Sequence, residues 1–220
     1  MADGYHPPVE EYLETIHGLT EEGTPAIQAR IAERLGRSAP SVSEMLDRLE
    51  DDGYVHRAGR VVELTDSGEE LAEKVVRRHR LAERLLVDVI GLEWWKVHRE
   101  AGRWEHVISD DVEARLVELL DNPSTCPHGN PIPGSAAGPP TVQVPLDEAE
   151  VGKELRLVRV SEQVELDMSS LAYLDEHGFI PGASGKLVER RPDGTVVLDV
   201  DGATVDLAPE LAARLFVAPA

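Results

Sequence analysis

Apolar side chains recur with a helical period through the first half of the chain. Between Pro7 and Thr20 they return every three or four residues, which is the spacing of one face of an amphipathic helix. Thr24 and Pro25 suit the N-cap and first-turn positions of a second, short helix that ends at Gly36. The apolar positions of these two predicted helices are Val9, Tyr12, Leu13, Ile16, Leu19, Ile27, Ile31 and Leu35.

A third helix is predicted to begin at Ser38 and to end at Gly53. Two short helices joined by a tight turn predict a helix-turn-helix motif, whose second helix enters the major groove of DNA. Residues 54–64 then read as a β-hairpin with its turn at Ala58 and Gly59, so the segment predicts a winged helix-turn-helix. The candidate DNA-contacting residues are Gln28, Arg37, Ser38, Pro40, Ser41, Ser43, Glu44, Arg57 and Arg60.

A long helix is predicted from Thr65 to Ile90, and it carries two apolar faces. A small domain can cover only one such face, so the second face favours a helix–helix dimer interface. The alternative is that the next two helices of the same chain cover it. The last of these is predicted to begin after Ser109, with Asp110 and Asp111 placed favourably in its first turn.

Residues 122–145 change abruptly to Pro, Gly, Ser, Thr and Ala, which predicts a linker. Cys126 and His128 lie in it, but two ligands on a flexible segment would make a poor metal site. After the linker, five short strands and one helix at residues 168–177 predict a small SH3-like barrel. The predicted strands lie at residues 155–160, 185–190, 195–200, 203–207 and 215–217.

The resulting fold class is mainly α and multidomain. We expect a winged helix-turn-helix domain at residues 1–70, a helical metal-binding and dimerisation domain at 71–122, a linker at 123–146 and an SH3-like domain at 147–220. The longest apolar runs are far too short to cross a bilayer, and the N-terminus lacks the pattern of a signal peptide. With one cysteine, Cys126, the sequence excludes an intrachain disulfide framework, and a cytoplasmic protein is expected.

The formal net charge of −20 argues against non-specific binding of polyanions by the whole molecule. The first 68 residues hold six arginines and no lysine against fourteen Asp and Glu residues, so the predicted DNA-binding segment is acidic too. Carboxylates can, however, be concentrated where a cation is meant to neutralise them. An acidic chain therefore also fits a protein whose affinity for DNA is switched on by metal.

The segment from Arg78 to Ser109 gathers side chains of the types that bind metal. Helical spacing places His79 and Glu83 on one face, and His98 and Glu105 on another, with His106 beside Glu105. Imidazole and carboxylate donors suit Fe(II), Mn(II), Co(II) and Zn(II). The simpler alternative is that these residues are ordinary polar groups on solvated helix faces.

Five motifs carry a resemblance to a known family: EEYLETI at residues 10–16, ARIAERL at 29–35, RRHRLAERLL at 77–86, RWEHVISD at 103–110 and HGNPIPG at 128–134. They resemble the metal-dependent regulators of the diphtheria toxin repressor family, and the last domain looks like that family's SH3-like, ferrous-transport-associated module. The resemblance implies a homodimeric repressor that binds double-stranded operator DNA when Mn(II) or Fe(II) is bound. Co(II), Ni(II) or Zn(II) would act as surrogates.

The resemblance also implies two metal sites. The ancillary site would use His79, Glu83, His98, Glu162 and Glu165. The activating site would use Glu11, Glu14, Glu105 and His106, with position 102 as a further ligand position. Iron-type members place methionine at Glu11 and cysteine at Gly102, and manganese-type members place acids at both, so Gly102 leaves this site one side chain short. Glu44 stands where iron-type members commonly have Gln, which is expected to change base preference.

The sequence leaves two other classes of function open. A winged-helix regulator could respond to a small organic ligand, with the polar cluster merely structural. A metalloenzyme is the more distant alternative, because the sequence has no HExxH helix, no obvious nucleophile–base pair and no Gly-rich phosphate loop. We therefore expect no enzyme.

Overall fold

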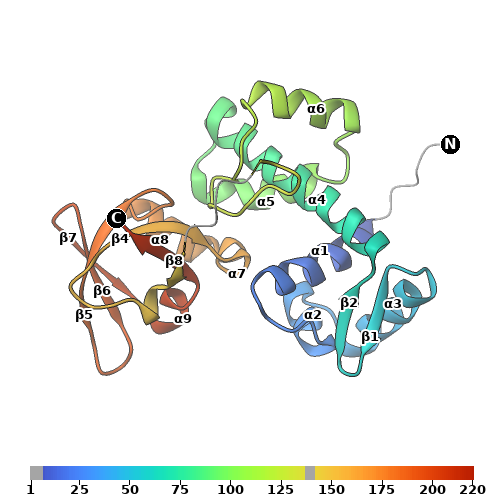
Figure 1. Cartoon of the computed structure of the whole chain (residues 1–220), viewed down its shortest axis with the longest axis horizontal. Coiled ribbons are helices and arrows are strands. Elements are labelled where there is room, and N and C mark those ends of the chain that lie inside the picture. Colours follow the sequence, from blue (N-terminus) through green and yellow to red (C-terminus); the bar gives the residue numbers. More distant parts are fainter. Residues whose placement is uncertain (1–6, 137–141) are drawn as a thin grey trace. The chain divides into compact units, whose positions relative to one another are not determined.

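The computed structural model describes residues 7–136 and 142–220, which form two compact units. Of the described residues, the first unit contains those up to His79 together with Arg103–Asp110, and the second contains Arg80–Gly102 and those from Asp111 onward (Figure 1). Among the described helices, none combines the length and the apolar character needed to span a membrane.

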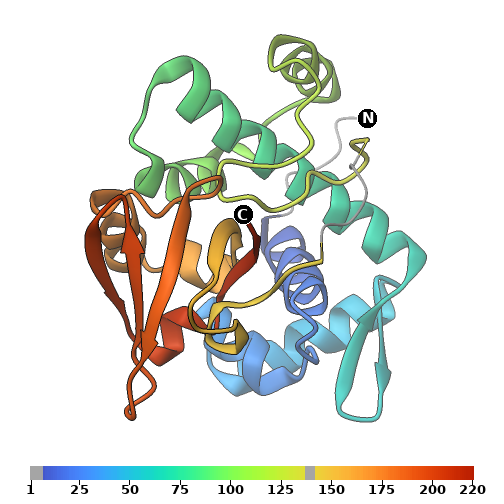
Figure 2. The same cartoon turned by 60° about the vertical axis from the view of Figure 1, so that its left-hand side comes forward.

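The first unit is a winged helix-turn-helix, as predicted. Its helices are α1 (Pro7–Glu21), α2 (Gln28–Leu35), α3 (Ala39–Asp51) and most of α4 (Asp66–Arg84), and its hairpin pairs β1 (Val55–Ala58) with β2 (Val61–Leu64). The core is formed by the predicted apolar stripes, with Leu13, Ile16, Ile31, Leu46 and Leu49 almost completely buried. Figures 1 and 2 both show the hairpin beside α3.

The start of α2 differs from the prediction. Thr24 and Pro25 do not open the helix, because Ile27 is extended (φ −102°, ψ 152°) and forms a β-bridge with Val61 of the hairpin. The amide of Val62 also donates to the carbonyl of Ala26 at 2.8 Å. Tertiary pairing with the hairpin therefore delays the helix, and local capping signals could not reveal this.

The turn and caps around α3 follow the sequence. Gly36 ends α2 with φ +60°, the left-handed conformation that glycine adopts without a steric penalty. Ser38 is the N-cap of α3, and its Oγ accepts from the amide of Ser41 at 3.4 Å. Nε2 of Gln28 donates to the carbonyl of Ala39 at 2.9 Å, which ties the first turn of α2 to that of α3.

In the second unit, the end of α4 continues as a π-helical turn, η1 (Leu85–Ile90). A 3-10 turn, η2 (Trp94–Lys96), follows, and then α5 (Val97–Trp104) and α6 (Asp110–Leu119). Leu81, on the second apolar face of the long helix, is buried within the chain, whereas Val89 and Ile90 are about half exposed. The intrachain alternative thus holds for the middle of this helix, whereas the apolar side chains at its end stay partly exposed.

The rest of the second unit is a curved six-stranded antiparallel sheet with the order β3-β8-β4-β5-β6-β7, seen at lower left in Figure 2. The strands are β3 (Val144–Pro145), β4 (Glu154–Val160), β5 (Ser184–Arg190), β6 (Val196–Val200), β7 (Ala203–Leu207) and β8 (Leu215–Pro219). The short elements η3 (Leu146–Glu148), α7 (Glu162–Glu165), α8 (Met168–Glu176) and α9 (Pro209–Ala212) complete it. The prediction found α8 and five strands but missed β3, α7 and α9.

Part of the predicted linker is an ordered loop. Residues 124–135 fold back on themselves, because Thr125 bridges with Pro131 and the amide of Cys126 donates to the carbonyl of Asn130. The loop also lies against β4, where the amide of Val160 donates to the carbonyl of His128 at 3.0 Å. The composition suggested flexibility here, but two local contacts and one long-range hydrogen bond hold the loop in place. Residues 137–141 of the predicted linker lie outside the described part of the chain.

Trp94 joins the helical part of the second unit to the sheet. It is 7% exposed and belongs to the same apolar cluster as Leu171 and Leu174 of α8 and Phe179. Its indole Nε1 donates to the carbonyl of Pro127 at 2.9 Å. The SH3-like sheet is therefore anchored by an apolar contact that needs no ion.

Candidate metal centres

The first cluster of metal-ligand side chains lies in the first unit. Glu14 of α1, His79 of α4 and Glu105 offer ligand atoms that all lie within 4.8 Å of one another. Nδ1 of His79 pairs with Oε2 of Glu105, and it lies 4.0 Å from Oε1 of Glu14. His79 and Glu105 are buried, so water does little to screen their charges.

His106 extends this cluster. Its Nε2 lies 3.1 Å from Oε1 of Glu105, and its Nδ1 lies 2.5 Å from Oε2 of Glu10. The hydrogen bond with Glu10 is the main reason that the pKa of His106 is raised, against the opposing effect of burial. Glu10, His106, Glu105 and His79 thus form one continuous chain of hydrogen bonds and ion pairs.

The structure brings Glu10, and not Glu11, into contact with this cluster. Oε2 of Glu11 lies 3.9 Å from Nη2 of Arg37, and both side chains are well exposed. The reason is helical register: Glu10 and Glu14 are four residues apart, about 40° round the helix, whereas Glu11 and Glu14 differ by about 60° in the other direction. Glu11 was expected from the family resemblance, and Glu10 was not among the predicted ligands.

Gly102 lies in α5, and a Cβ built on it meets no atom within 4 Å. A side chain at this position would therefore enter open space.

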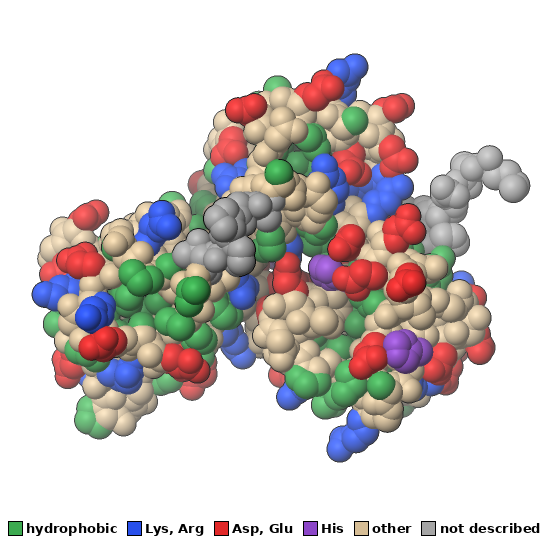
Figure 3. All heavy atoms as spheres, viewed as in Figure 1, with side chains coloured by type: hydrophobic (Ala, Val, Ile, Leu, Met, Phe, Trp, Pro, Cys, Tyr) green, Lys and Arg blue, Asp and Glu red, His purple; other side chains and the backbone are tan. Residues whose placement is uncertain are grey.

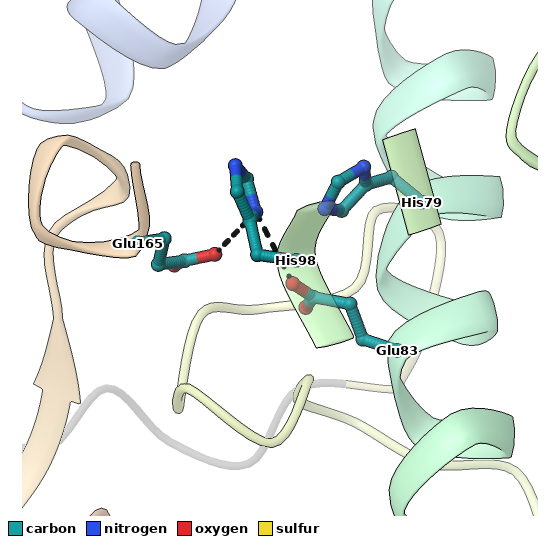
Figure 4. A group of neighbouring side chains, drawn as sticks. All are labelled: His79, Glu83, His98 and Glu165. Carbon is teal, nitrogen blue, oxygen red and sulfur yellow. Dashed lines mark hydrogen bonds and ion pairs between the residues drawn. The ribbon is translucent and has the colours of Figure 1, made fainter. Parts of the chain in front are cut away.

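The second cluster lies in the second unit. Nδ1 of His98 is 3.2 Å from Oε1 of Glu83 and 3.0 Å from Oε2 of Glu165, so it bridges α4 and α7 (Figure 4). Nδ1 of His128 reaches the same two carboxylates, at 3.1 Å and 3.3 Å. Sγ of Cys126 completes a group with Glu83 and His128 whose ligand atoms lie within 4.8 Å of one another.

Burial and charge shift the pKa values of this cluster strongly. Burial disfavours a charged His128, but Glu83 and Glu165 outweigh it and hold its pKa well above the ordinary value. Burial would likewise raise the pKa of Glu165, yet the charge of His128 holds it well below its usual range. Burial raises the pKa of the Cys126 thiol to about 11, so in this state the thiol keeps its proton.

The second donor set fits a divalent cation. Nε2 of His128 is buried and has no hydrogen-bond partner among the described residues, which is costly unless another group binds there. Carboxylate, imidazole and sulfur donors together suit a borderline ion such as Zn(II), Co(II) or Fe(II). Cys126 and His128 were not among the predicted ligands, because the composition of their segment is that of a linker.

One residue of the predicted ancillary set, Glu162, lies differently. Glu162 begins α7 and is half-buried, one turn before Glu165, and it is not in any potential ligand group found among the described residues. His79, also drawn in Figure 4, lies one turn before Glu83 on α4, and Nδ1 of its imidazole pairs with Glu105 in the first unit.

The predicted DNA-contacting residues lie around α3 and the hairpin. Most are solvent-exposed: Arg37, Ser38, Pro40, Ser41, Glu44, Arg57 and Arg60. Ser43 is half-buried, and Gln28 is occupied by its bond to Ala39. On the face in Figure 3, acidic side chains are spread among the basic ones, as the net charge leads one to expect.

Comparison with known families covers almost the whole chain. Residues 6–61 match the family described as "Iron dependent repressor, N-terminal DNA binding domain", and residues 65–134 match "Iron dependent repressor, metal binding and dimerisation domain". Residues 144–219 match the FeoA domain. These three matches follow one another along the chain without overlap.

Individual relatives agree. The chain is 48% identical over 204 residues to the iron-dependent repressor IdeR of Mycobacterium tuberculosis (strain ATCC 25618 / H37Rv), with 88% of each chain covered. It is 42% identical over 212 residues to the diphtheria toxin repressor of Corynebacterium diphtheriae, with 92% of this chain and 93% of that protein covered.

Solved structures give the same result. A manganese-dependent transcriptional repressor in complex with manganese superposes with a TM-score of 0.84 at 34% identity, over 96% of this chain and 100% of that one. The structure of ScaR with bound Zn²⁺ superposes with a TM-score of 0.80 at 30% identity, over 96% and 99%.

The fold and these relationships define a metal-dependent transcriptional repressor with a C-terminal SH3-like domain. The chain belongs to the iron-dependent repressor family, as its motifs implied. The predicted fold class and the predicted metal class, iron or manganese, are confirmed by these comparisons.

Proposed function

We propose that this protein represses transcription as a homodimer that binds operator DNA when a divalent metal occupies the first cluster. The observation that carries the proposal is the convergence of Glu14, His79 and Glu105, from three separate segments, to within 4.8 Å. Glu10 and His106 extend the same cluster. The proposed ligands are Glu10, Glu14, His79, Glu105 and His106, with Glu11 kept as the alternative from α1.

Charge explains why metal would matter. Three carboxylates lie beside two imidazoles in this cluster, and ionised carboxylates repel one another when a cation is absent. A bound divalent ion supplies positive charge and fixed ligand directions. Glu10 and Glu14 would then hold α1 against α4 and the segment after α5, which fixes the helix-turn-helix for binding in the major groove.

The donor set, oxygen and nitrogen only, favours Mn(II) or Fe(II) in the first cluster. The second cluster contains sulfur and two imidazoles, which favours Zn(II), Co(II) or Fe(II). Glu83, His98, Cys126, His128 and Glu165 are its proposed ligands. They come from α4, α5, the 124–135 loop and α7, so an ion there would join the SH3-like domain to the helices of its own unit.

We propose the same domain assignments that the sequence predicts: DNA binding by residues 1–70, metal binding and dimerisation by 71–122, and the SH3-like domain from 147. The partner in dimerisation is a second copy of the chain. Four exposed apolar side chains of the second unit support this: Val89, Ile90, Val112 and Leu119. We further propose that the protein is a cytoplasmic regulator and not an enzyme.

The test is DNA binding with controlled metal. Duplexes are first selected from a random-sequence pool by the manganese-loaded protein, and their affinity is then measured in chelator, Mn(II), Fe(II) and Zn(II). We expect tight binding only with metal, and loss of binding in Glu105→Gln. Glu150→Gln, at an exposed ion pair with Lys153 in the SH3-like domain, is the matched control and should bind normally. Equal affinity in chelator and in metal would overturn the proposal and favour a non-metal ligand.

A further inference from the structure

Arg57 does not point freely into solvent from the wing. Its Nη1 donates to Oε2 of Glu50 at 2.7 Å, and its Nη2 donates to Oδ1 of Asp47 at 2.6 Å. Its backbone amide also donates to Oε1 of Glu50 at 3.1 Å. Three hydrogen bonds therefore connect β1 of the wing to the C-terminal half of α3, all within the first unit.

The two acceptors lie on the helix that is expected to enter the major groove. Asp47 and Glu50 are three residues apart and therefore neighbours on the surface of α3. Glu44 is exposed one turn before Asp47, and Asp51 follows Glu50. Unpaired carboxylates here would repel DNA phosphates, so a fixed cation beside Asp47 and Glu50 lowers that repulsion.

The planar guanidinium suits this role, since its separate N–H groups can serve two carboxylates at once. A lysine ammonium would lack this fixed geometry. The neighbouring residue on β1, His56, pairs instead with Glu63 of β2 at 2.9 Å. Of these two adjacent residues of β1, His56 therefore braces the hairpin itself and Arg57 ties it to α3.

We propose that Arg57 is a positioning residue for operator recognition and not a phosphate contact. It sets the wing against α3 and neutralises Asp47 and Glu50. The phosphate contacts of the wing then fall to Arg60, which is exposed in the turn between β1 and β2. The inference rests on the DNA-binding function of the first unit.

A charge exchange separates the two roles. A duplex selected by the manganese-loaded wild-type protein is titrated with Arg57→Glu, with Glu50→Arg, and with the double variant. Each single exchange places like charges together, and we expect each to weaken binding at least about tenfold. The double variant restores an ion pair and the net charge, and it should recover to within about threefold of the wild type.

The salt dependence gives the second readout. Each phosphate contact contributes about 0.9 to the slope of log affinity against log salt. We expect the double variant to keep the wild-type slope, whereas Arg60→Ala should lower it by about one. Arg191→Glu, the same charge change at an exposed pair with Asp206 in the SH3-like domain, is the control and should leave affinity within about twofold.

The proposal is overturned if the double variant binds as weakly as Arg57→Glu and its slope is lower by about one, because Arg57 would then contact phosphate directly. Manganese affinity and thermal unfolding of each variant are measured alongside. If the weakening of a single variant is accompanied by loss of the folded state, the double variant still decides between the two roles. Failure of the wild type to select any duplex would instead overturn the DNA-binding function.

Discussion

Oε2 of Glu10 lies 2.5 Å from Nδ1 of His106, a residue 96 positions later in the sequence. Because Glu10 is a proposed ligand from α1, we expect Glu10→Gln to lower the affinity for the activating metal by at least about tenfold, since even the loss of an outer-shell partner costs about that much. Glu11→Gln should change affinity by less than about threefold. Isothermal titration with Mn(II) measures both. A larger loss in Glu11→Gln than in Glu10→Gln would restore Glu11 as the ligand.

Position 102 offers a test of metal choice. A side chain there meets no other atom within 4 Å of its Cβ, so substitution is sterically tolerated. Gly102→Glu should tighten Mn(II) binding by adding an oxygen donor, and Gly102→Cys should shift preference toward softer ions. Affinities, not melting temperatures, are compared.

Gly102→Ala is the control for that experiment, because replacing glycine within a helix stabilises it by about 1 kcal/mol for reasons unrelated to metal. It should raise thermal stability without changing metal affinity. Unchanged affinity and selectivity in both Gly102→Glu and Gly102→Cys would mean that position 102 does not face the ion.

Cys126 is expected to bind metal as a thiolate although its pKa in the metal-free protein is raised to about 11. A coordinated cation displaces the thiol proton, so the Co(II)-loaded protein should show thiolate-to-cobalt charge-transfer absorption. Cys126→Ser should abolish this absorption and weaken Zn(II) binding more than Mn(II) binding. An unchanged spectrum in the serine variant would remove Cys126 from the site. Mn(II) activation of DNA binding serves as the control and should persist.

Because Trp94 is buried against α8, we expect the SH3-like domain to stay docked on the helices of its own unit without metal. Truncation of a buried aromatic side chain costs about 3–5 kcal/mol, so Trp94→Ala should expose the partners of Trp94 on α8. Hydrogen exchange at Leu171 and Leu174 in chelator should rise strongly in this variant. Val89→Ala, at an exposed position, should leave exchange unchanged. If wild-type exchange in chelator already equals that of Trp94→Ala, an ion and not the indole holds the domain.

The N-cap of α8 should make the free energy of unfolding depend on pH. Asp167 accepts from the hydroxyl of Ser170 at 2.6 Å and from the amide and hydroxyl of Ser169 at 3.0 Å and 2.8 Å, which lowers its pKa below 3.8. Because the pKa is lowered on folding, the stabilisation is complete above pH 4 to 5 and is lost as the pH falls through the folded value.

Asp167→Ala should therefore lower the free energy of unfolding by about 1 kcal/mol at pH 7, typical of a lost N-cap. The difference from the wild type should shrink toward pH 3. Urea unfolding followed by tryptophan fluorescence measures this. Asp167→Asn keeps an acceptor but cannot titrate, so its loss at pH 7 should be smaller than that of Asp167→Ala, and its difference from the wild type should also shrink toward pH 3. An equal loss for Asp167→Ala at pH 7 and pH 3 would contradict this assignment.

Periodicity and capping predicted the winged helix, α8 and most strands because those signals act within a few residues. They failed where distant pairing decides: Ile27 is extended through its bridge to Val61. The same limit applied to the sites. His79, Glu83, His98 and Glu105 could be found from helical spacing, but His128 could be placed only by the contacts of its loop with β4.

Gly129 allows the 124–135 loop to lie close against β4. Its φ is +89°, and an added Cβ would lie 2.1 Å from the carbonyl oxygen of Val158 on β4. Because Cys126 and His128 depend on this close approach for their positions, one hydrogen atom in place of a methyl group decides whether sulfur and imidazole reach Glu83. A substitution at a residue that binds nothing could thus convert a mixed sulfur, nitrogen and oxygen centre into one of nitrogen and oxygen alone, and metal selectivity in such a chain could change without the loss of any ligand residue.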